Sequence, residues 1–338
     1  MKPVAMVGWS GRGRQEDLER TAWHKLGLAQ KTERTGDVMI IDSKDTVAVA
    51  RSLAMLPGVA WVAVGYRFAG NHGYLECLAS LAKRYLAKGR SFRISAQAVR
   101  SRESPGDLIL AGNSKVLAEI DGTRVDERKP LVRFRVSVDG GEGACGVEIV
   151  AGPGGTPTGN EWVSCLVSGG ANSSSMAWMV ALAGFSVRLV HSRVDEASLR
   201  MVAKLYSELS FRMDPRRLEV VLLEGHGPPL GRLGIWLRRQ NETAFAGLRP
   251  QSASAISDLA AAFPNLVLPM LLFQEETVSG TFRSLGLGRP PAGTSPELTK
   301  EALETGAGGS EVRFGGTYAD ANAVIDALKK RLGPTKDL

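Results

Sequence analysis

Hydrophobic and polar residues follow two different spacings along this chain, and the changes between them predict alternating strands and helices. Short apolar runs such as VAMV and VMII predict strands, whereas apolar residues three or four positions apart predict helices. The elements predicted over residues 1–70 are strand 4–7, helix 15–26, strand 38–41, helix 46–56 and strand 59–64. This order predicts a ferredoxin-like domain in the first 70 residues.

The next 80 residues predict a second α/β domain, over residues 71–150. Apolar residues at helical spacing open it, and a strand of alternating character follows. A glycine-rich turn at residues 139–143 separates two apolar runs, which predicts a hairpin. The predicted elements are helix 74–87, strand 92–98, helix 107–120, strand 132–138 and strand 146–150.

The segment AGPGGTPTGN, residues 151–160, is so rich in glycine and proline that it predicts a linker. Beyond it, strands and helices alternate again, which predicts a parallel sheet with crossover helices in a domain of residues 161–338. The fold class is therefore α/β. After the first strand, loop and helix of this domain, the predicted elements are strand 187–191, helix 196–209, strand 218–223, helices 232–243 and 255–263, strand 266–272, loop and short helix over 286–312, and helix 319–332.

The stretch SCLVSGGANSSSMAWMV, residues 164–180, carries the main candidate chemistry of the sequence. An apolar strand stops at two glycines, small polar residues follow, and then a helix begins. Ligands of open α/β sheets bind beyond the carboxyl ends of the strands, and free N–H groups at a helix start attract phosphate. The loop matches neither GxGxxG nor GxxxxGK[ST], so it is either a phosphate-binding loop of another kind or a tight turn before a helix. The candidate nucleotide-binding residues are Ser168, Gly169, Gly170, Asn172, Ser173 and His191, which ends a strand at the same edge.

The charge of the chain is uneven. Residues 1–150 contain 23 Lys and Arg against 17 Asp and Glu, a net charge of +6 out of the total of +7. This asymmetry favours a polyanionic partner, because each neutralised phosphate releases counterions. Aromatic residues make up only 6% of the chain, so a nucleic acid, if it is the polyanion, is expected to be recognised by phosphate contacts and shape more than by base stacking.

Cysteine and histidine usage argues against a structural metal. The three cysteines are far apart, and the four histidines have no zinc-like spacing. Cys77 and Cys165 lie at apolar positions, where an inert buried thiol is expected. The sequence has no apolar run long enough to cross a membrane and no signal-peptide pattern, which predicts a cytoplasmic protein.

The segment GPGGTPTGNEWVSCLVSGGANSS, residues 152–174, resembles the entry to the PP-loop ATP pyrophosphatase domain of the tRNA 4-thiouridine synthetases, also called tRNA sulfurtransferases. The preceding stretches FRISAQAVRSRESPGDLIL, VDERKPLVRFRVSVDG and GVEI resemble their RNA-binding THUMP domain. The resemblance therefore implies a ferredoxin-like domain, a THUMP domain and a parallel-sheet PP-loop domain, which is an adenine nucleotide alpha hydrolase-like fold.

The resemblance also implies a reaction. ATP, with Mg²⁺, would bind at the loop and activate the uridine carbonyl at tRNA position 8 by adenylation, and persulfide sulfur would then displace AMP. The implied partners are tRNA, a sulfur-donor protein and a second copy of the chain in a homodimer. The implied RNA-binding residues of the THUMP-like region are Lys83, Arg84, Lys88, Arg90, Arg93, Arg100, Arg102, Arg133 and Arg135.

Several charged groups of the family pattern are replaced here. The aspartate of the family loop is Asn172, and a neutral amide organises magnesium poorly. Leu248 and Leu268 stand where the family has glutamate and arginine, and Gln274-Glu275 stands where it has aspartate and lysine. None of the cysteines matches a sulfur-carrying position.

Two hypotheses stay open on these grounds. One is an ATP-dependent tRNA sulfurtransferase, and the other is an RNA-binding paralogue that has lost the catalysis. A THUMP-bearing methyltransferase is disfavoured, because no glycine-rich loop of that kind follows the linker. Gln251 and Ser254 are additional candidates for contact with RNA or nucleotide.

Overall fold

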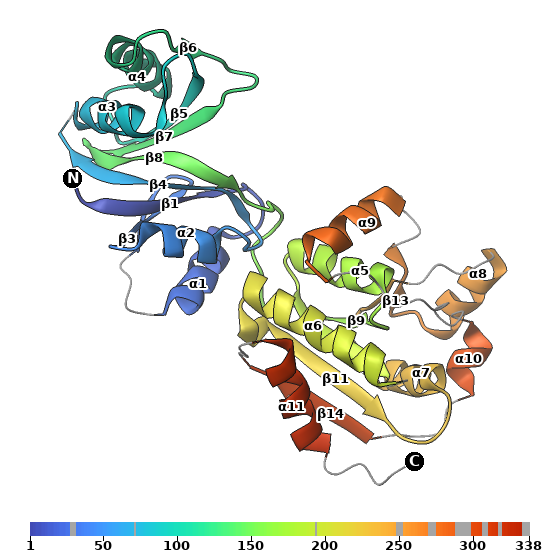
Figure 1. The fold of residues 1–338 in the computed structure, drawn as a ribbon. Coiled ribbons are helices and arrows are strands. Elements are labelled where there is room, and N and C mark those ends of the chain that lie inside the picture. Colours follow the sequence, from blue (N-terminus) through green and yellow to red (C-terminus); the bar gives the residue numbers. More distant parts are fainter. Residues whose placement is uncertain are drawn as a thin grey trace. The chain divides into compact units, whose positions relative to one another are not determined.

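The computed structural model describes residues 1–27, 32–70, 72–192, 195–247, 253–269, 275–287, 299–305, 310–316 and 320–332. The chain forms two compact units, Met1–Pro157 and Thr158–Leu338 (Figure 1). No helix within these described ranges is long and apolar enough to cross a membrane. The predicted α/β fold class is confirmed, and each unit is built around one sheet.

The N-terminal unit is a mixed sheet of eight strands in the order β2-β3-β1-β4-β8-β7-β5-β6. The central pairs β1–β4, β4–β8 and β7–β8 are antiparallel, whereas β5 runs parallel to β7. The sheet is continuous through both of the domains predicted for residues 1–150. Its elements are β1 (Pro3–Trp9), α1 (Gln15–Leu26), β2 (Thr32–Thr35), β3 (Val38–Asp42), α2 (Thr46–Leu53), β4 (Val59–Ala69), α3 (Gly73–Tyr85), β5 (Ser91–Val99), α4 (Pro105–Glu119), β6 (Arg124–Val125), β7 (Val132–Asp139) and β8 (Glu142–Ala151).

The helices of this unit pack on the sheet through two apolar clusters. One joins α1 and α2 to β1, β3 and β4, and the other joins α3 and α4 to β5, β7 and β8. Alternate residues of β1 and β3 point to the opposite face, where Val4, Met6, Val38 and Ile40 form a smaller buried cluster. The sheet curves over this cluster, since the Gln97 side chain of β5 donates a hydrogen bond to a β2 carbonyl.

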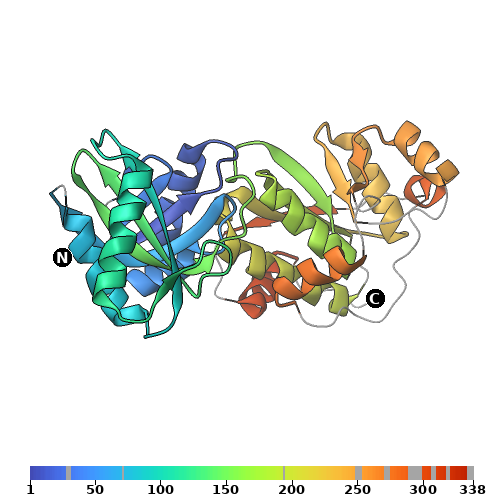
Figure 2. The ribbon, with the colours of Figure 1, turned by 90° about the horizontal axis from the view of Figure 1, so that it is seen from above.

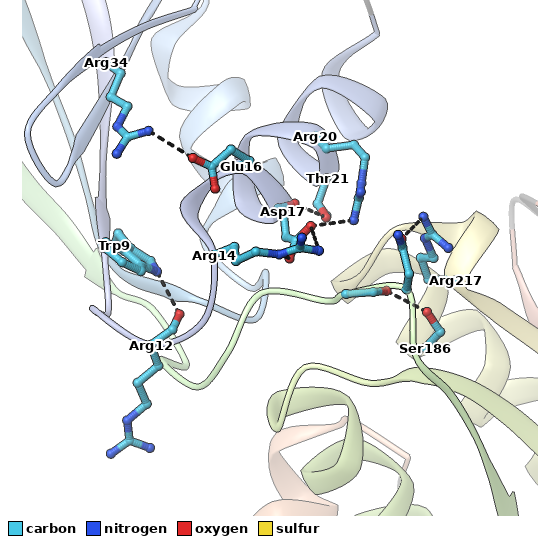
Figure 3. A network of polar contacts seen from close by, with 12 residues as sticks. Trp9, Arg12, Arg14, Glu16, Asp17, Arg20, Thr21, Arg34, Ser186 and Arg217 are labelled. Carbon is cyan, nitrogen blue, oxygen red and sulfur yellow. Dashed lines mark hydrogen bonds and ion pairs between the residues drawn. The ribbon is translucent and has the colours of Figure 1, made fainter. Parts of the chain in front are cut away.

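Charged residues fix the start of α1. The Asp17 carboxylate is nearly buried and accepts hydrogen bonds from Arg14 on one side and Arg20 on the other (Figure 3). The Glu16 side chain pairs with Arg34 of β2. Helix α4 begins with a capping box between Ser104 and Asp107, which satisfies N–H groups that would otherwise lack partners.

The C-terminal unit is a six-stranded sheet in the order β13-β12-β9-β10-β11-β14. All neighbouring pairs are parallel except β11–β14, which is antiparallel. The chain moves outward from β9 to β11 and then returns to place β12 on the other side of β9, so the strand order reverses there. Its elements are β9 (Trp162–Leu166), α5 (Ala171–Leu182), β10 (Ser186–Ser192), α6 (Glu196–Arg212), a 3-10 turn η1 (Pro215–Arg217), β11 (Leu218–Glu224), α7 (Pro229–Arg239), β12 (Ala244–Ala246), α8 (Ala253–Ala262), β13 (Leu266–Val267), α9 (Glu275–Ser284), α10 (Lys300–Glu304), β14 (Ser310–Gly315) and α11 (Ala321–Leu332).

Helices cover both faces of this sheet (Figures 1 and 2). Helices α5, α6, α9 and α11 pack on one face, where Met176, Tyr206 and Phe282 are buried. Helices α7, α8 and α10 pack on the other face, around Trp236 and Phe263. Strands buried on both faces read as continuous apolar runs, which is the pattern that the sequence shows for β9 and β11.

The structure corrects two of the predicted elements. Helix α7 ends at Arg239, so the predicted continuation to residue 243 is wrong, and strand β12 begins at Ala244. Strand β14 begins inside residues 286–312, which were predicted as loop and short helix. Strands β2, β6 and β12 were not predicted. Each has at most four residues, too few to show the apolar run that predicts a strand.

Candidate nucleotide and nucleic-acid sites

The glycine-serine loop lies where the strand order of the C-terminal sheet reverses. It joins the carboxyl end of β9 to the first turn of α5, and β12 is the neighbour of β9 on the other side. Gly170 is the N-cap of α5 and, within the described residues, no side chain caps this helix. The free N–H groups of the first turn and the helix dipole therefore make this end of α5 suitable for an anion.

Two serine hydroxyls brace the loop from within. The Ser173 hydroxyl accepts the N–H of Ser168 at 3.2 Å and donates to the carbonyl of Gly170 at 3.1 Å. The Ser168 hydroxyl in turn accepts the N–H of Gly170 at 3.4 Å. Ser168 is exposed and Ser173 is buried, so Ser168 is the hydroxyl of this pair that can reach a ligand directly.

The two serines that follow in the SGGANSSS stretch do not add donors to the loop surface. Ser174 and Ser175 are fully buried. The Ser175 hydroxyl donates to the carbonyl of Val278 on α9, 3.0 Å away. These two serines therefore contribute to the packing of α5 rather than to ligand binding.

Two glycines allow the backbone of the loop to pack closely. Gly169 has φ of +84°, and a Cβ there would lie 2.9 Å from the Cβ of Met201 on α6. Gly247, just after β12, packs on the start of α5, and a Cβ there would lie 2.5 Å from the Cα of Ser173. A larger residue at either position would push the loop away from its supports.

His191 supports the loop from the neighbouring strand. Its Nδ1 lies 2.8 Å from the carbonyl oxygen of Val167, and its Nε2 lies 3.4 Å from the hydroxyl of Ser198 on α6. His191 is only 1% exposed. Asp195 caps α6 by accepting the Ser198 N–H, and this hydrogen bond lowers the pKa of its carboxyl. His191 therefore holds the end of β9, and its burial limits direct contact with a ligand.

The structure describes some of the positions at which the sequence departs from the family pattern. Asn172 is exposed on the first turn of α5. Across the described ranges, no group of three His, Cys, Asp or Glu side chains could hold a metal ion. Leu268 packs on an apolar cluster, and Ser254 is exposed on α8. Leu248, Gln251 and Gln274 lie outside the described residues.

A buried arginine at the same sheet edge was not found from the sequence. Arg232 of α7 donates from Nε to the Ser192 hydroxyl at 3.0 Å, and from Nη1 to the carbonyls of Gly225 and Gly227. Burial lowers the pKa of its guanidinium. It ties the ends of β10 and β11 together. A single arginine inside the pattern LGRLGIWL, on the apolar side of the helix, is the sequence signal for it.

The nine predicted RNA-binding residues fall into three groups of the N-terminal unit. Four lie at the end of α3 and before β5, three lie on one face of β5 and β7, and two follow β5. Arg90 and Arg100 flank the nine residues of β5, which places them roughly 30 Å apart along the strand. The groups are Lys83, Arg84, Lys88 and Arg90; Arg93, Arg133 and Arg135; and Arg100 and Arg102.

The group on β5 and β7 is largely neutralised. Arg133 and Arg135 both pair with Glu148 of β8, whose side chain is 8% exposed. The guanidinium of Arg135 also stacks 4.4 Å above the Trp61 ring. Arg93 pairs with Glu127. Because the Arg135 side chain is only 21% exposed, it acts as a structural contact more than as a free cation.

The group after β5 lines a cavity. Arg100, Arg102 and His72 lie around a volume of about 440 Å³, beside the β7–β8 turn. Arg100 makes a two-pronged pair with Asp139, and its exposed guanidinium holds the pKa of that carboxyl below its usual value. Arg102 is exposed and, in the part of the chain that the structure describes, forms no ion pair. Glu103 also lines this cavity, so among its described residues Arg102 is the arginine without an ion pair.

Two lysines of the group at the end of α3 form ion pairs. Lys83 pairs with Glu119, and Lys88 pairs with Asp121 on the surface.

The three cysteines, Cys77, Cys145 and Cys165, are all 0% exposed. Burial raises the pKa of the Cys145 and Cys165 thiols, which disfavours the nucleophilic thiolate. The expectation of inert core thiols at Cys77 and Cys165 agrees with this burial.

The fold and the loop together define an α/β protein with a glycine-rich loop at the reversal point of a doubly wound sheet. No family model matches its sequence. Among curated proteins, a probable tRNA sulfurtransferase of Aeropyrum pernix is 32% identical over 201 residues, which cover 55% of this chain and 49% of that protein. A tRNA sulfurtransferase of Pyrobaculum aerophilum is 34% identical over 103 residues, which cover 30% of this chain and 20% of that protein.

Solved structures share the fold. PH1313 from Pyrococcus horikoshii superposes with a TM-score of 0.68 at 16% identity, covering 84% of this chain and 99% of that one. A 4-thiouridine synthetase in complex with RNA and bound ATP gives a TM-score of 0.66 at 15% identity, covering 85% and 86%. The two curated relatives confirm the resemblance to tRNA sulfurtransferases, and the chain is similar to proteins of that name. Its matches span about half the length of the first curated relative and a fifth of the second.

Proposed function

We propose that this protein binds ATP at the loop Ser168–Ser173 and tRNA on its N-terminal unit, and that it acts in ATP-dependent thiolation of tRNA. The observation that carries the proposal is the uncapped start of α5 behind Gly169 and Gly170, at the reversal point of the sheet. Ligands of open α/β sheets bind at such a point. The relatives named tRNA sulfurtransferases support tRNA as the substrate.

The proposed reaction has two steps. The O4 atom of the uridine at tRNA position 8 attacks the α-phosphorus of ATP, and pyrophosphate leaves. The outer sulfur of a donor persulfide then attacks C4, the C4–O4 bond breaks and AMP leaves. A second thiol of the donor attacks the S–S bond in the same step, so 4-thiouridine is released and the donor ends as a disulfide. Adenylation is needed because the carbonyl oxygen by itself is a poor leaving group. The loop contributes N–H groups that stabilise the negative charge on the phosphates.

The sulfur comes from a separate donor in this proposal. The three cysteines are buried in the two cores and cannot present a persulfide at the surface. Magnesium would arrive bound to the ATP phosphates, with few protein oxygens as ligands, as is usual for this ion. A homodimer remains a prediction from the family resemblance.

RNA binding is assigned first to the cavity beside Arg100 and Arg102. Its guanidinium groups suit phosphate oxygens, which they can contact through two parallel hydrogen bonds. The surface pairs of Lys83, Lys88 and Arg93 are weak enough to exchange for phosphate contacts. Arg133 and Arg135 are assigned a structural role, because they share one buried carboxylate.

A second candidate is an RNA-binding paralogue without sulfur transfer, and Asn172 favours it. At this exposed position of the loop an amide replaces the carboxylate of the family pattern. The loop would then keep its shape and its affinity for phosphates without organising the metal for reaction.

Calorimetric titration with ATP and Mg²⁺, together with pyrophosphate release in the presence and absence of tRNA, separates the two functions. The sulfurtransferase proposal expects ATP binding and pyrophosphate release that depends on tRNA. Binding of tRNA without any release of pyrophosphate would support the second candidate. If neither ATP nor tRNA binds, both are wrong.

A further inference from the structure

A second basic cavity lies on the helix-covered face of the N-terminal unit, away from Arg100 and Arg102. It has a volume of about 240 Å³ and lies between the first turn of α2 and the last turn of α3, with β4 as its floor. Its polar lining consists of Lys44, Thr46, Tyr66, Arg84 and Tyr85. Val47, at the rim, is 45% exposed. The cavity therefore opens at the junction between the two helix pairs that cover the sheet.

The charge of this cavity is positive and is not neutralised locally. Among the described residues that line it, none carries a carboxylate. Neither Lys44 nor Arg84 forms an ion pair within the described part of the chain, in contrast to Lys83, which pairs with Glu119. Asp45, next to Lys44 in the sequence, is engaged as the N-cap of α2 and accepts the Ala48 N–H. An anion is the ligand that such a cavity favours.

Arg84 is held in place before any ligand arrives. Its Nη1 donates to the Tyr66 hydroxyl at 3.1 Å, and its guanidinium lies 5.3 Å from the centre of the Tyr85 ring. The Tyr66 oxygen accepts this bond, so its own proton stays available to donate to a ligand. A guanidinium fixed by two tyrosines loses little further freedom on binding, and this lowers the entropic cost of ligand capture.

The size of the cavity limits the ligand. Sites for drug-sized molecules and whole cofactors usually measure about 300–1,000 Å³, so a cavity of about 240 Å³ is better suited to a phosphate with its attached sugar. Planar guanidinium, ammonium and hydroxyl donors match phosphate oxygens. Val64 and Leu81 provide an apolar wall for the sugar.

We propose that this cavity binds one phosphodiester of the RNA backbone, as a second RNA contact separate from the Arg100 and Arg102 cavity. The inference rests on the proposed RNA-binding function and adds Lys44, Thr46 and Tyr66 to the residues that carry it. The bound group is a phosphate of a polynucleotide, because the cavity is too small to enclose a complete nucleotide.

The test compares tRNA binding by the full-length wild type, Lys44→Gln, Arg84→Gln and the double variant over a series of salt concentrations. The matched control is Arg51→Gln, which removes one exposed positive charge from α2 outside the cavity. We expect the double variant to bind at least about tenfold more weakly and its salt slope to fall by roughly one, as for one lost phosphate contact. Arg84→Lys should recover part of the affinity, and Arg51→Gln should remain within about twofold of wild type. Circular dichroism checks that each variant is folded.

The outcomes separate this inference from the proposed function. If the wild type binds tRNA and the double variant behaves like Arg51→Gln, the cavity inference is wrong and the RNA-binding proposal stands. If the wild type does not bind tRNA, both are wrong. If inorganic phosphate or AMP occupies the cavity by NMR while tRNA affinity is unchanged in the double variant, the source is a free phosphate and the inference is overturned.

Discussion

The imidazole Nδ1 of His191 lies 2.8 Å from the main-chain oxygen of Val167, and this contact joins strand β10 to the end of β9 where the loop begins. A carbonyl oxygen can only accept, so Nδ1 carries a proton and donates it to Val167, while Nε2 lies 3.4 Å from the Ser198 hydroxyl. One side chain thus fixes the exit of β9.

Replacing His191 by phenylalanine is expected to loosen the loop. The Val167 carbonyl would lose its donor while staying buried, at a cost of about 1–3 kcal/mol. Urea unfolding and hydrogen exchange in β9 and α5 measure this change, and ATP affinity should fall with it. His226→Gln is the matched control, since His226 is exposed after β11. Equal stability of the two variants would contradict the supporting role of His191.

Gly169→Ala is expected to abolish nucleotide binding. The backbone there has φ of +84°, and the new methyl group would lie 2.9 Å from the Cβ of Met201. Gly286→Ala carries the same kind of backbone strain with no atom within 4 Å, so it serves as the control. The positive φ alone costs a non-glycine residue about 1 kcal/mol or somewhat more in folding stability. Gly169→Ala should cost more stability than this, because its methyl group also meets Met201. Calorimetry with ATP checks the result, and retention of full affinity would refute the assignment of the loop.

Asn172→Asp is expected to strengthen the dependence of ATP binding on magnesium. The side chain is exposed on the first turn of α5, and a carboxylate there is a better ligand for Mg²⁺ than an amide. ATP titrations with Mg²⁺ and with EDTA measure the difference, and Asn172→Ala controls for loss of the amide. An identical response of both variants would mean that magnesium does not reach this position.

Arg102→Gln is expected to change tRNA binding, whereas Arg135→Gln is expected to change folding stability. Loss of Arg102 should weaken tRNA binding and lower the salt slope by roughly one. Loss of Arg135 should leave the slope nearly unchanged and lower the stability of the unit by about 1–3 kcal/mol, because Glu148 would lose one of its two arginines. Salt-dependent binding and urea unfolding test the two variants together, and a reversed pattern would contradict the assignment.

Glu119 makes the pairing of α3 with α4 sensitive to acid. Hydrogen bonds from Lys83, and next from Lys115, lower the pKa of its carboxyl from 4.5 to about 2. Because the pKa of Glu119 is lower in the folded chain than in the unfolded chain, its ion pairs stabilise the fold above pH 4.5. This stabilisation is lost as the pH falls towards 2. NMR titration of the Glu119 carboxyl and acid unfolding measure it. Glu119→Gln should flatten the profile in this range, and an unchanged profile would exclude a contribution from Glu119.

Much of the fold could be predicted from the sequence because hydrophobic spacing is a local property. All helices through α6 and most strands through β11 follow directly from it, and so does the position of the loop between β9 and α5. The resemblance to tRNA sulfurtransferases also rested on local motifs around residues 152–174, and the curated relatives confirm it. Strands β2, β6 and β12 were not predicted, because strands of two to four residues are too short to show an apolar run.

The sequence could not predict which basic side chains of the candidate RNA site are available to a ligand. The resemblance implied nine basic residues as RNA-binding, yet the availability of each depends on partners that are distant in the chain. Arg133 and Arg135 meet Glu148 across two strands, whereas Arg102 and Lys44 form no ion pair in the described ranges. Charge counts cannot distinguish these cases, because the partner of each side chain is set by strand register.

The sequence by itself determined most of the elements, their order and the residue types of the glycine-serine loop, since these depend on residues that are neighbours in the chain. Only the tertiary structure decided that Gly247 packs on Ser173, that His191 holds Val167, and that Lys44 and Arg84 share a cavity. These contacts join residues separated by 24 to 74 positions. Such contacts form only when strand order and helix packing bring the side chains together, so no local pattern records them.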